Sequence, residues 1–373
     1  MKKTFIKGRR DLALTVFIPE HCRNGCHFCT SKKDYSCHAP NLDQVLKTAK
    51  RLKNIDIQSM VITGGEPLAN LDTLRAVLDA FPFERVYLNT TFPDFSRKET
   101  IANIDFINED PRIAGVNISR HTTSFELDQE IFSEDILSDQ ELYDIVKPIR
   151  INVVLGQDHS IVLSSRATEL DLFLYQTIKR WEKFQIAREE YLKSFGYSSD
   201  EIGPVSVNFR GDYRRETRES LHDIMDDVSR SFYRQNLTDI TSGGCDVCHN
   251  ISGRKENLWV HYHKGLELSS LELIPELIQV NDLLVFQDGH LAYDWDRKDE
   301  DMNQLLEQWK ITVPVLKPIK KIKPPVKKAK PISTGSCGGG AGATCGDWLG
   351  AMTTRIRPSV SYGSCGGGSL GSC

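Results

Sequence analysis

The sequence of 373 residues contains no run of 18 apolar residues, the length that a helix needs to cross a membrane. Its first residues are basic, but no apolar segment of signal-peptide length follows them before the next charges. These absences argue against a membrane-spanning or secreted protein. Ten cysteines without a secretory signal are more typical of metal binding or catalysis in the reducing cytoplasm than of a disulfide scaffold.

Charge is distributed unevenly along the chain. Residues 317–331 contain seven Lys, four Pro and no acidic residue. Residues 333–373 contain twelve Gly, seven Ser and four Cys but only three charges. The first 316 residues contain 38 basic and 50 acidic side chains, a net charge of −12. We therefore expect an acidic body, a basic linker and a nearly neutral tail.

Strand-like and helix-like segments alternate over the first 210 residues. Short apolar runs predict strands, and apolar residues at helical spacing predict the helices between them. This alternation predicts an α/β fold with a parallel sheet, and six such units favour an open, partial (β/α)6 barrel. The predicted strands are residues 12–18, 59–63, 85–88, 115–119, 149–155 and 205–209, and the predicted helices are 42–52, 71–81, 101–107 and 169–192.

The pattern divides the chain into four predicted parts. Residues 1–212 form the partial barrel, and residues 213–316 form a small α+β extension packed on it. The linker, 317–332, should be extended because its prolines block a helix. The tail, 333–373, should be disordered, since its few large apolar side chains cannot offset the entropy of ordering. The elements predicted in the extension are a helix at 214–233, strands at 258–263 and 283–286, and a helix at 299–310.

Cys22, Cys26 and Cys29 lie in a loop directly after the first predicted strand. Three and two residues separate them, which allows three thiolates to surround one point. Three thiolates can hold three irons of a [4Fe–4S] cube and leave the fourth iron open to a small molecule. Spacing alone also leaves open a zinc knuckle completed by His27 or Cys37.

A second motif ends the second predicted strand. Gly64 and Gly65 let the backbone approach a ligand closely, and Glu66 before Pro67 can accept hydrogen bonds from an ammonium group. A Gly-Gly-Glu-Pro turn is a weak signal by itself. Its position one strand after a three-cysteine loop makes the combination specific, and it lowers the weight of the zinc alternative.

In these two motifs the sequence resembles the radical S-adenosylmethionine (radical SAM) superfamily, including the aromatic residue, Phe28, before the last cysteine. The resemblance covers roughly residues 10–210. It implies that the three cysteines hold a [4Fe–4S] cluster and that residues 64–67 face the methionine amine of S-adenosylmethionine. It further implies an external electron donor such as flavodoxin or ferredoxin, and a 5′-deoxyadenosyl radical that removes hydrogen from a substrate.

Further positions match the superfamily more loosely. Ser119 and Arg120 follow the fourth predicted strand, where relatives often place groups for the ribose and carboxylate of the cofactor. Asn89 and Asn152 could point into the same site, and Phe28 could lie against the adenine. An ordinary role in stabilising the fold is an equally good interpretation of each.

Cys245 and Cys248 form a second pair, with His249, His261 and His263 nearby. The pair could be half of a zinc site or of an auxiliary iron–sulfur cluster. It could equally be a thiol pair that stabilises a turn, or a reversible disulfide. Many peptide-modifying relatives carry seven cysteines after the barrel, whereas residues 210–316 contain only two.

The tail resembles the core regions of ribosomally made, post-translationally modified peptides, in which radical enzymes crosslink Cys sulfur to carbon. We therefore expect a peptide substrate, with the chain's own tail as a candidate and the linker as a tether rather than a nucleic-acid-binding arm. One alternative is a radical enzyme acting on a small molecule or nucleotide, with the tail a metal-handling appendage. Another is a non-enzymatic metal- or nucleic-acid-binding protein.

Overall fold

Most of the first 309 residues are described in a computed structural model of the chain. The linker and the tail, for which an extended tether and disorder were predicted, lie outside the described residues. No described helix is long and apolar enough to span a bilayer. The structure describes residues 3–7, 12–24, 26, 28–29, 37–83, 85–155, 167–211, 227–245, 248–265, 270–295 and 302–309.

Six parallel strands form the centre of the main sheet, as the sequence predicted. They follow one another in chain order from β2 to β7, each paired with the next. The sheet does not close into a barrel, because β7 pairs with β10 and β2 pairs with β13. The six strands are β2 (Ala13–Ile18), β3 (Ser59–Gly64), β4 (Val86–Thr90), β5 (Ile113–Ser119), β6 (Ile149–Val154) and β7 (Val205–Arg210).

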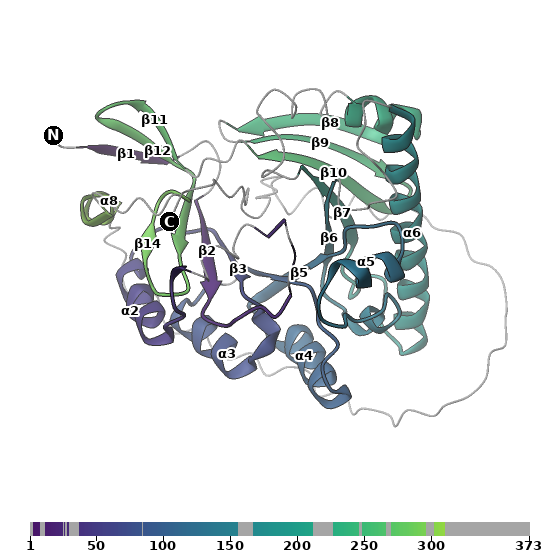
Figure 1. The fold of residues 1–373 in the computed structure, drawn as a ribbon, viewed down its shortest axis with the longest axis horizontal. Coiled ribbons are helices and arrows are strands. Elements are labelled where there is room, and N and C mark those ends of the chain that lie inside the picture. Colours follow the sequence, from purple (N-terminus) through teal and green to yellow (C-terminus); the bar gives the residue numbers. More distant parts are fainter. Residues whose placement is uncertain are drawn as a thin grey trace. The chain divides into compact units, whose positions relative to one another are not determined.

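Helices cover the outer side of these strands (Figure 1). Side-chain caps fix several helix starts: Asn41 accepts a hydrogen bond from the Gln44 amide, and Ser96 and Glu99 form a capping box. The predicted helices are confirmed, and α5 and the two short 3-10 turns were not predicted. The helical segments are α2 (Leu42–Leu52), η1 (Pro67–Ala69), α3 (Leu71–Ala80), α4 (Arg97–Glu109), α5 (Phe125–Ile131), η2 (Glu141–Asp144) and α6 (Ala167–Ser194).

The predicted extension contributes strands to both ends of the main sheet. The hairpin strands β8 (Thr238–Cys245) and β9 (Cys248–Lys255) continue the sheet through β10 (Leu258–Gly265), which runs parallel to β7. At the other end lie β13 (Asp282–Val285) and β14 (Leu291–Ala292). The predicted strands at 258–263 and 283–286 are thus confirmed. The proposed boundary at residue 212 stays a prediction.

A separate small sheet joins distant parts of the sequence. Strand β1 (Thr4–Lys7) pairs in parallel with β12 (Leu277–Val280), which pairs with β11 (Ser270–Ile274). The predicted closing helix is α8 (Met302–Trp309). Of the helix predicted at 214–233, only the part from 227 onward lies within the described residues, and it is helical.

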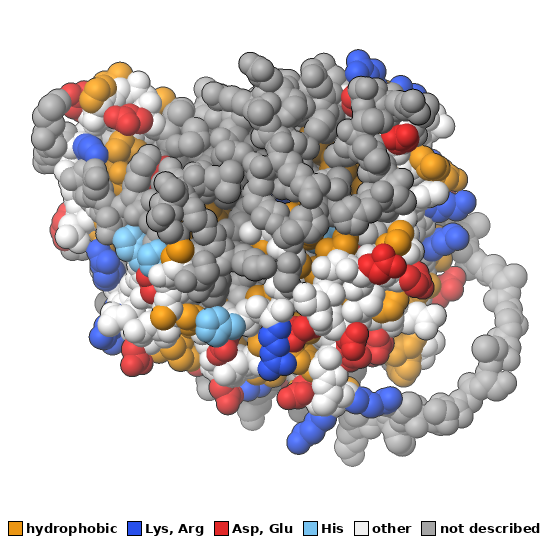
Figure 2. Space-filling view, in the orientation of Figure 1, with side chains coloured by type: hydrophobic (Ala, Val, Ile, Leu, Met, Phe, Trp, Pro, Cys, Tyr) orange, Lys and Arg blue, Asp and Glu red, His pale blue; other side chains and the backbone are white. Residues whose placement is uncertain are grey.

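The two faces of the parallel strands differ in chemistry. In β6, Ile149, Ile151 and Val153 are buried in the main hydrophobic core, whereas Arg150 and Asn152 alternate with them and are half-buried. Strand β7 repeats this alternation of apolar and polar residues. Because successive side chains of a strand point to opposite faces, the outer face packs on the helices and the inner face is polar. On the described outer surface, acidic and basic side chains are interspersed (Figure 2).

Candidate functional site

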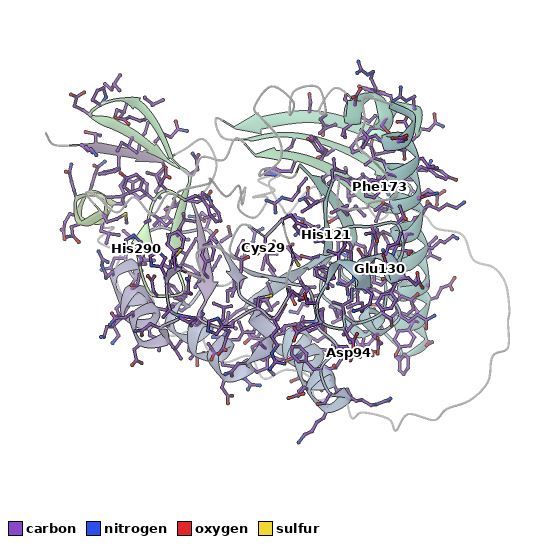
Figure 3. All side chains as sticks on the ribbon, in the orientation of Figure 1. Cys29, Asp94, His121, Glu130, Phe173 and His290 are labelled. Atoms are coloured by element: carbon purple, nitrogen blue, oxygen red, sulfur yellow. The ribbon has the colours of Figure 1, made fainter. Side chains whose placement is uncertain are left out.

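A cavity opens where the parallel strands end, and we call it the cysteine cavity. It encloses about 1020 Å³, part of it open to solvent, and its walls are the loops after the strands and the last residues of β3 to β7. Figure 3 shows two of its residues, Cys29 and His121, on the inner side of the strands. Its lining includes these residues singled out from the sequence: Cys22, Cys26, Cys29, Phe28, Gly64, Gly65, Glu66, Asn89, Ser119 and Asn152.

The three cysteines lie on one turn after β2. The amide of Cys29 donates to the carbonyl of Cys26 at 3.2 Å, which tightens the turn. Desolvation raises the pKa of the Cys22 thiol to about 11, and nearby negative charges act in the same direction. A bound metal centre would therefore have to displace this proton. Within the described residues, no three Cys, His, Asp or Glu side chains converge on a point that a single metal ion could occupy.

An apolar cluster packs against Cys26 and Cys29, whereas Cys22 is exposed. Cys26 packs in it with Phe132 and Ile136, and Phe28 and Cys29 are half-buried against it. Such a surrounding limits the access of water to whatever the thiols hold. A set of three thiols in a cavity of this size, with an apolar wall, fits an iron–sulfur cluster with one open iron.

The two glycines of the second motif each have a structural reason. Gly64 has φ +98°, a conformation that favours glycine. A Cβ added to Gly65 would lie 1.6 Å from the carbonyl oxygen of Glu20. The backbone before the cysteine loop therefore crosses the glycine turn so closely that no side chain fits between them.

Glu66 is buried, with 3% of its surface exposed. One carboxylate oxygen accepts from the Thr90 hydroxyl at 2.6 Å and from the Leu68 amide at 3.1 Å. The other accepts from the amide and the hydroxyl of Thr91, at 3.1 and 3.0 Å. Burial raises the pKa of Glu66, and these four hydrogen bonds oppose the rise. The carboxylate thus joins the end of β3 to the end of β4, while its contact with an ammonium group stays a prediction. Pro67 directly follows as the first residue of η1.

Asn24 connects the cysteine loop to this carboxylate. Its Nδ2 donates to the Thr91 hydroxyl at 3.1 Å, and the same hydroxyl donates to Glu66. Its Oδ1 accepts from the amide of Glu134 at 3.2 Å. The two sequence motifs are therefore linked through one threonine. Neither Asn24 nor Thr91 was singled out from the sequence, because single polar residues in loops carry no spacing signal.

Ser119 and Arg120 have different surroundings. Ser119 lines the cysteine cavity, and its contact with the cofactor stays a prediction. Arg120 is fully buried and donates to the carbonyls of Thr91, Ser119 and Leu137 at 2.7 to 2.8 Å. Burial lowers the pKa of Arg120 to about 10. These bonds hold the loops after β4 and β5 together, so its described contacts are those of a positioning residue.

His121 is a cavity residue that the sequence analysis did not identify. Its ring meets Phe28 edge-on, with 4.6 Å between centroids, and lies 5.6 Å from Phe132. Its Nδ1 accepts from the amide of Val154, so in the neutral ring the proton is on Nε2. Buried Asp128 accepts the amide of His121 and thereby fixes the turn.

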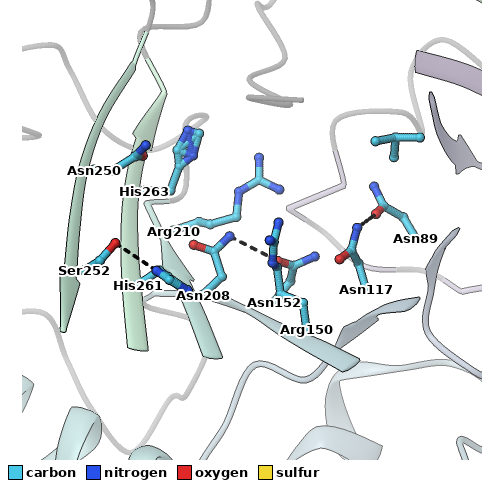
Figure 4. A pocket seen from close by; sticks show the side chains of 11 residues that line it. Asn89, Asn117, Arg150, Asn152, Asn208, Arg210, Asn250, Ser252, His261 and His263 are labelled. Atoms are coloured by element: carbon cyan, nitrogen blue, oxygen red, sulfur yellow. Dashed lines mark hydrogen bonds between the residues drawn. The ribbon is translucent and has the colours of Figure 1, made fainter. Parts of the chain in front are cut away.

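A second, narrower space lies along the inner faces of the strands, and we call it the inner chamber (Figure 4). It encloses about 500 Å³ and shares Asn89, Asn152 and Arg210 with the cysteine cavity. His261 and His263 of β10 both line it, so they face the same side of the strand. The remaining lining residues are Val61, Asn117, Arg150, Asn208, Asn250 and Ser252.

The second cysteine pair sits at a hairpin turn. Cys245 ends β8, Cys248 begins β9, and the two are cross-strand partners. Their side chains, and that of His249, lie outside the described residues. Metal binding by this pair therefore stays a prediction.

The sequence model of the radical SAM superfamily matches residues 16–131 of this chain. This segment runs from β2 to α5 and contains both motifs. The half-open parallel sheet is that of a partial radical SAM barrel. Residues 16–131 thus match the radical SAM superfamily, as the resemblance of the two motifs implied.

Solved structures of SuiB from Streptococcus suis are also similar. They include SuiB bound to S-adenosylmethionine, SuiB bound to the precursor peptide SuiA, and SuiB alone, with 14%, 13% and 14% identity and TM-scores of 0.46, 0.47 and 0.46. Each covers 81% of this chain, which spans only 65–66% of theirs. No curated protein matches the chain. A likeness this distant carries no argument about substrate.

Proposed function

We propose that the protein uses a [4Fe–4S] cluster and S-adenosylmethionine to remove hydrogen from a peptide, with its own tail, residues 333–373, as the favoured substrate. The observation that supports the cofactor assignment is the meeting of two sequence motifs in one cavity. The cysteine turn and the Gly64–Glu66 turn line it together, and Asn24 and Thr91 connect them. When bound, the cofactors supply one-electron chemistry that breaks a C–H bond of the substrate.

Each part of the cavity has its own role in this proposal. Cys22, Cys26 and Cys29 would hold the cluster, and the apolar cluster beside them would exclude water. The glycine turn keeps the wall thin where the methionine part would lie, with Glu66 behind it. Phe28, backed by His121, would offer a ring edge or face to the adenine.

The composition of the tail supports a peptide substrate. Each of its four cysteines has a glycine or a serine beside it or within two residues, so exposed Cα–H bonds accompany every sulfur. Residues 317–336 connect the tail to the body, and in extended form they would span about 60 Å at roughly 3 Å per residue. A body of about 300 residues has a radius of gyration of about 20 Å. The tether is therefore long enough for Cys337 to reach the cavity.

Some parts of the proposal rest on the sequence alone. A flavodoxin or ferredoxin would supply the electron in a reducing compartment, and Cys245 and Cys248 would hold a second metal. The alternative substrate is a small polar molecule or a nucleotide. Among small molecules, the polar lining of the inner chamber favours a polar substrate over an apolar one.

The decisive experiment is anaerobic reconstitution of the full chain with iron, sulfide, reductant and S-adenosylmethionine, followed by fragment mass spectrometry. We expect a loss of about 2 Da per crosslink in fragments that contain Cys337, Cys345, Cys365 or Cys373. The control is the same chain without reductant. An unchanged tail mass after many cofactor turnovers would reject the tail as substrate and favour the small-molecule alternative.

A further inference from the structure

The inner chamber is lined by rows of polar side chains that run across neighbouring strands. Asn152 of β6 is paired in register with Asn208 of β7, which is paired with His261 of β10. Two residues further along β7, Arg210 is paired with His263 of β10. Figure 4 shows these side chains directed into a common space. Strands β6, β7 and β10 thus present hydrogen-bonding side chains on the same side of the chamber, in two successive rows of paired residues.

The chemistry of this lining is that of an anion site. Arg150 and Arg210 supply positive charge, and amides of asparagine supply N–H donors. The Asn152 oxygen accepts from Asn208 at 3.2 Å, and within the described residues its Nδ2 makes no hydrogen bond to the protein. Among the described residues, no Asp or Glu lines the chamber. This contrasts with the acidic body around it, whose net charge is −12.

The state of His261 agrees with positive surroundings. Its Nδ1 lies 2.9 Å from the Ser252 hydroxyl. Burial lowers the pKa of His261 to about 3, and the charge of Arg150 adds to this effect. The imidazole is therefore neutral at pH 7, so the two guanidinium groups dominate the charge of the lining.

The size of the chamber restricts what can enter. The chamber has about 500 Å³ of empty space, part of it open to solvent, about half that of the cysteine cavity. A carboxylate has three heavy atoms and fits such a space. The shared residues Asn89, Asn152 and Arg210 place this space directly beside the cysteine cavity.

We propose that the inner chamber binds a carboxylate of the substrate and so holds the neighbouring atoms at the cysteine cavity. This inference rests on the proposed function for its substrate, and for the tail it assigns the carboxylate of Asp347, the one acidic residue of 333–373. Cys345 precedes Asp347 by two residues, about 7 Å of extended chain. Anchoring Asp347 would therefore select the segment around Cys345 for reaction.

The first test uses the full chain and compares Asp347→Asn with the matched control Asp347→Glu, which keeps a carboxylate. We expect Asp347→Asn to slow the mass loss at the Cys345 fragment about tenfold or more, the loss of one charge-assisted contact. Asp347→Glu should retain most of the rate, and cofactor cleavage should continue in both. Equal rates of modification in the two variants would overturn the inference and leave the proposed function standing.

A double-mutant cycle tests whether Asp347 meets the chamber itself. Arg150 lines only the inner chamber, so Arg150→Gln leaves the lining of the cysteine cavity unchanged. If the two groups interact, Arg150→Gln and Asp347→Asn together should slow modification no more than either alone. If the double variant is slowed by the product of the two single factors, Asp347 does not interact with Arg150, and the assignment is overturned.

A binding measurement needs no catalysis and separates the two proposals. N-acetylaspartate should protect the Asp347→Asn chain against thermal unfolding, and its amide analogue N-acetylasparagine should not. Protection should be lost when Arg150→Gln is added, with circular dichroism at 20 °C confirming that the variant is folded. Protection in a protein whose tail is never modified would support the chamber and refute the tail as substrate. No protection by N-acetylaspartate in the folded Asp347→Asn chain would overturn the carboxylate site.

Discussion

The cysteine cavity and the inner chamber share three lining residues but are built in different ways. Loops at the ends of the strands form the cysteine cavity, and each of its two motifs is contiguous in sequence. Side chains from the strands themselves form the inner chamber, one or two from each strand. The cysteine cavity contains residues of both superfamily motifs. The inner chamber contains residues that neither motif includes, and in our proposal it binds part of the substrate.

The largest expected effect is loss of function in the cysteine cavity with ligand binding in the inner chamber unchanged. Replacing Cys22, Cys26 and Cys29 together by Ala should abolish iron–sulfur absorbance and cleavage of S-adenosylmethionine, because no other thiol lines the cavity among the described residues. Binding of N-acetylaspartate to the inner chamber should survive when the variant also carries Asp347→Asn. Absorption spectra and product chromatography provide the measurement, with the wild-type chain as the control. Cofactor cleavage by the triple variant would refute the cluster assignment.

Gly65→Ala should damage the cysteine cavity almost as severely. The added Cβ would lie 1.6 Å from the carbonyl oxygen of Glu20, so the backbone before the cysteine turn must move. We expect the iron content after reconstitution to fall at least severalfold, measured as iron bound per chain. Gly196→Ala is the matched control, since Gly196 has a positive φ but no neighbour within 4 Å of the added Cβ. Normal iron content in Gly65→Ala would mean that the crossing is not needed for the site.

Sequence predicted the two regions unequally, for a physical reason. The cysteine turn and the glycine turn are local, so their spacing identifies them before any fold is known. The six parallel strands were also predicted, because short apolar runs alternate with helix-like segments along the chain. Strand pairing, however, decides which polar residues meet. Neither Arg150 nor Arg210 is unusual in its own strand. Only strand pairing places Arg210 opposite His263 and brings Arg150 into the same chamber as His261.

The pairing also explains which elements were missed. Strands β8 and β9 contain glycine, asparagine and serine at many positions, a composition that is poor in strand formers. Antiparallel pairing holds them rather than their own propensity: β9 pairs with β10, and β8 pairs with β9. Strand β1 has four residues, and its partner β12 lies more than 260 residues away in the sequence. No local pattern could identify such a pair.

Glu66→Gln should give a smaller, graded effect in the cysteine cavity. Four donors face the carboxylate, and an amide group would turn its own N–H bonds toward some of them. Loss of a charge-assisted contact costs roughly 1.5–3 kcal/mol, so affinity for S-adenosylmethionine should fall by about one to two decades while the cluster still forms. Calorimetry on the reconstituted protein checks this. Glu20→Gln is the control, and unchanged affinity in Glu66→Gln would remove Glu66 from cofactor binding.

The smallest expected effect concerns the inner chamber and pH. The pKa of His261 is lowered to about 3 by burial and by Arg150, while Arg210 of β7, His263 of β10 and the Ser252 hydroxyl of β9 share the same space. In the unfolded chain the imidazole has its ordinary pKa of about 6.5. Between these values the unfolded state binds the extra proton, so stability rises with pH and is lost as the pH falls below about 6.5.

The slope for this single proton is at most about 1.4 kcal/mol of unfolding free energy per pH unit. Denaturant unfolding at pH 7, 6 and 5 should therefore show a steeper loss of stability in the wild-type chain than in His261→Asn, which cannot take up this proton. Other titratable groups contribute equally to both chains and cancel in the difference. Parallel curves for the two chains would show that His261 is protonated in the folded state as readily as in the unfolded one. The inner chamber would then be less positive than its two guanidinium groups imply, and the contrast with the cysteine cavity would weaken.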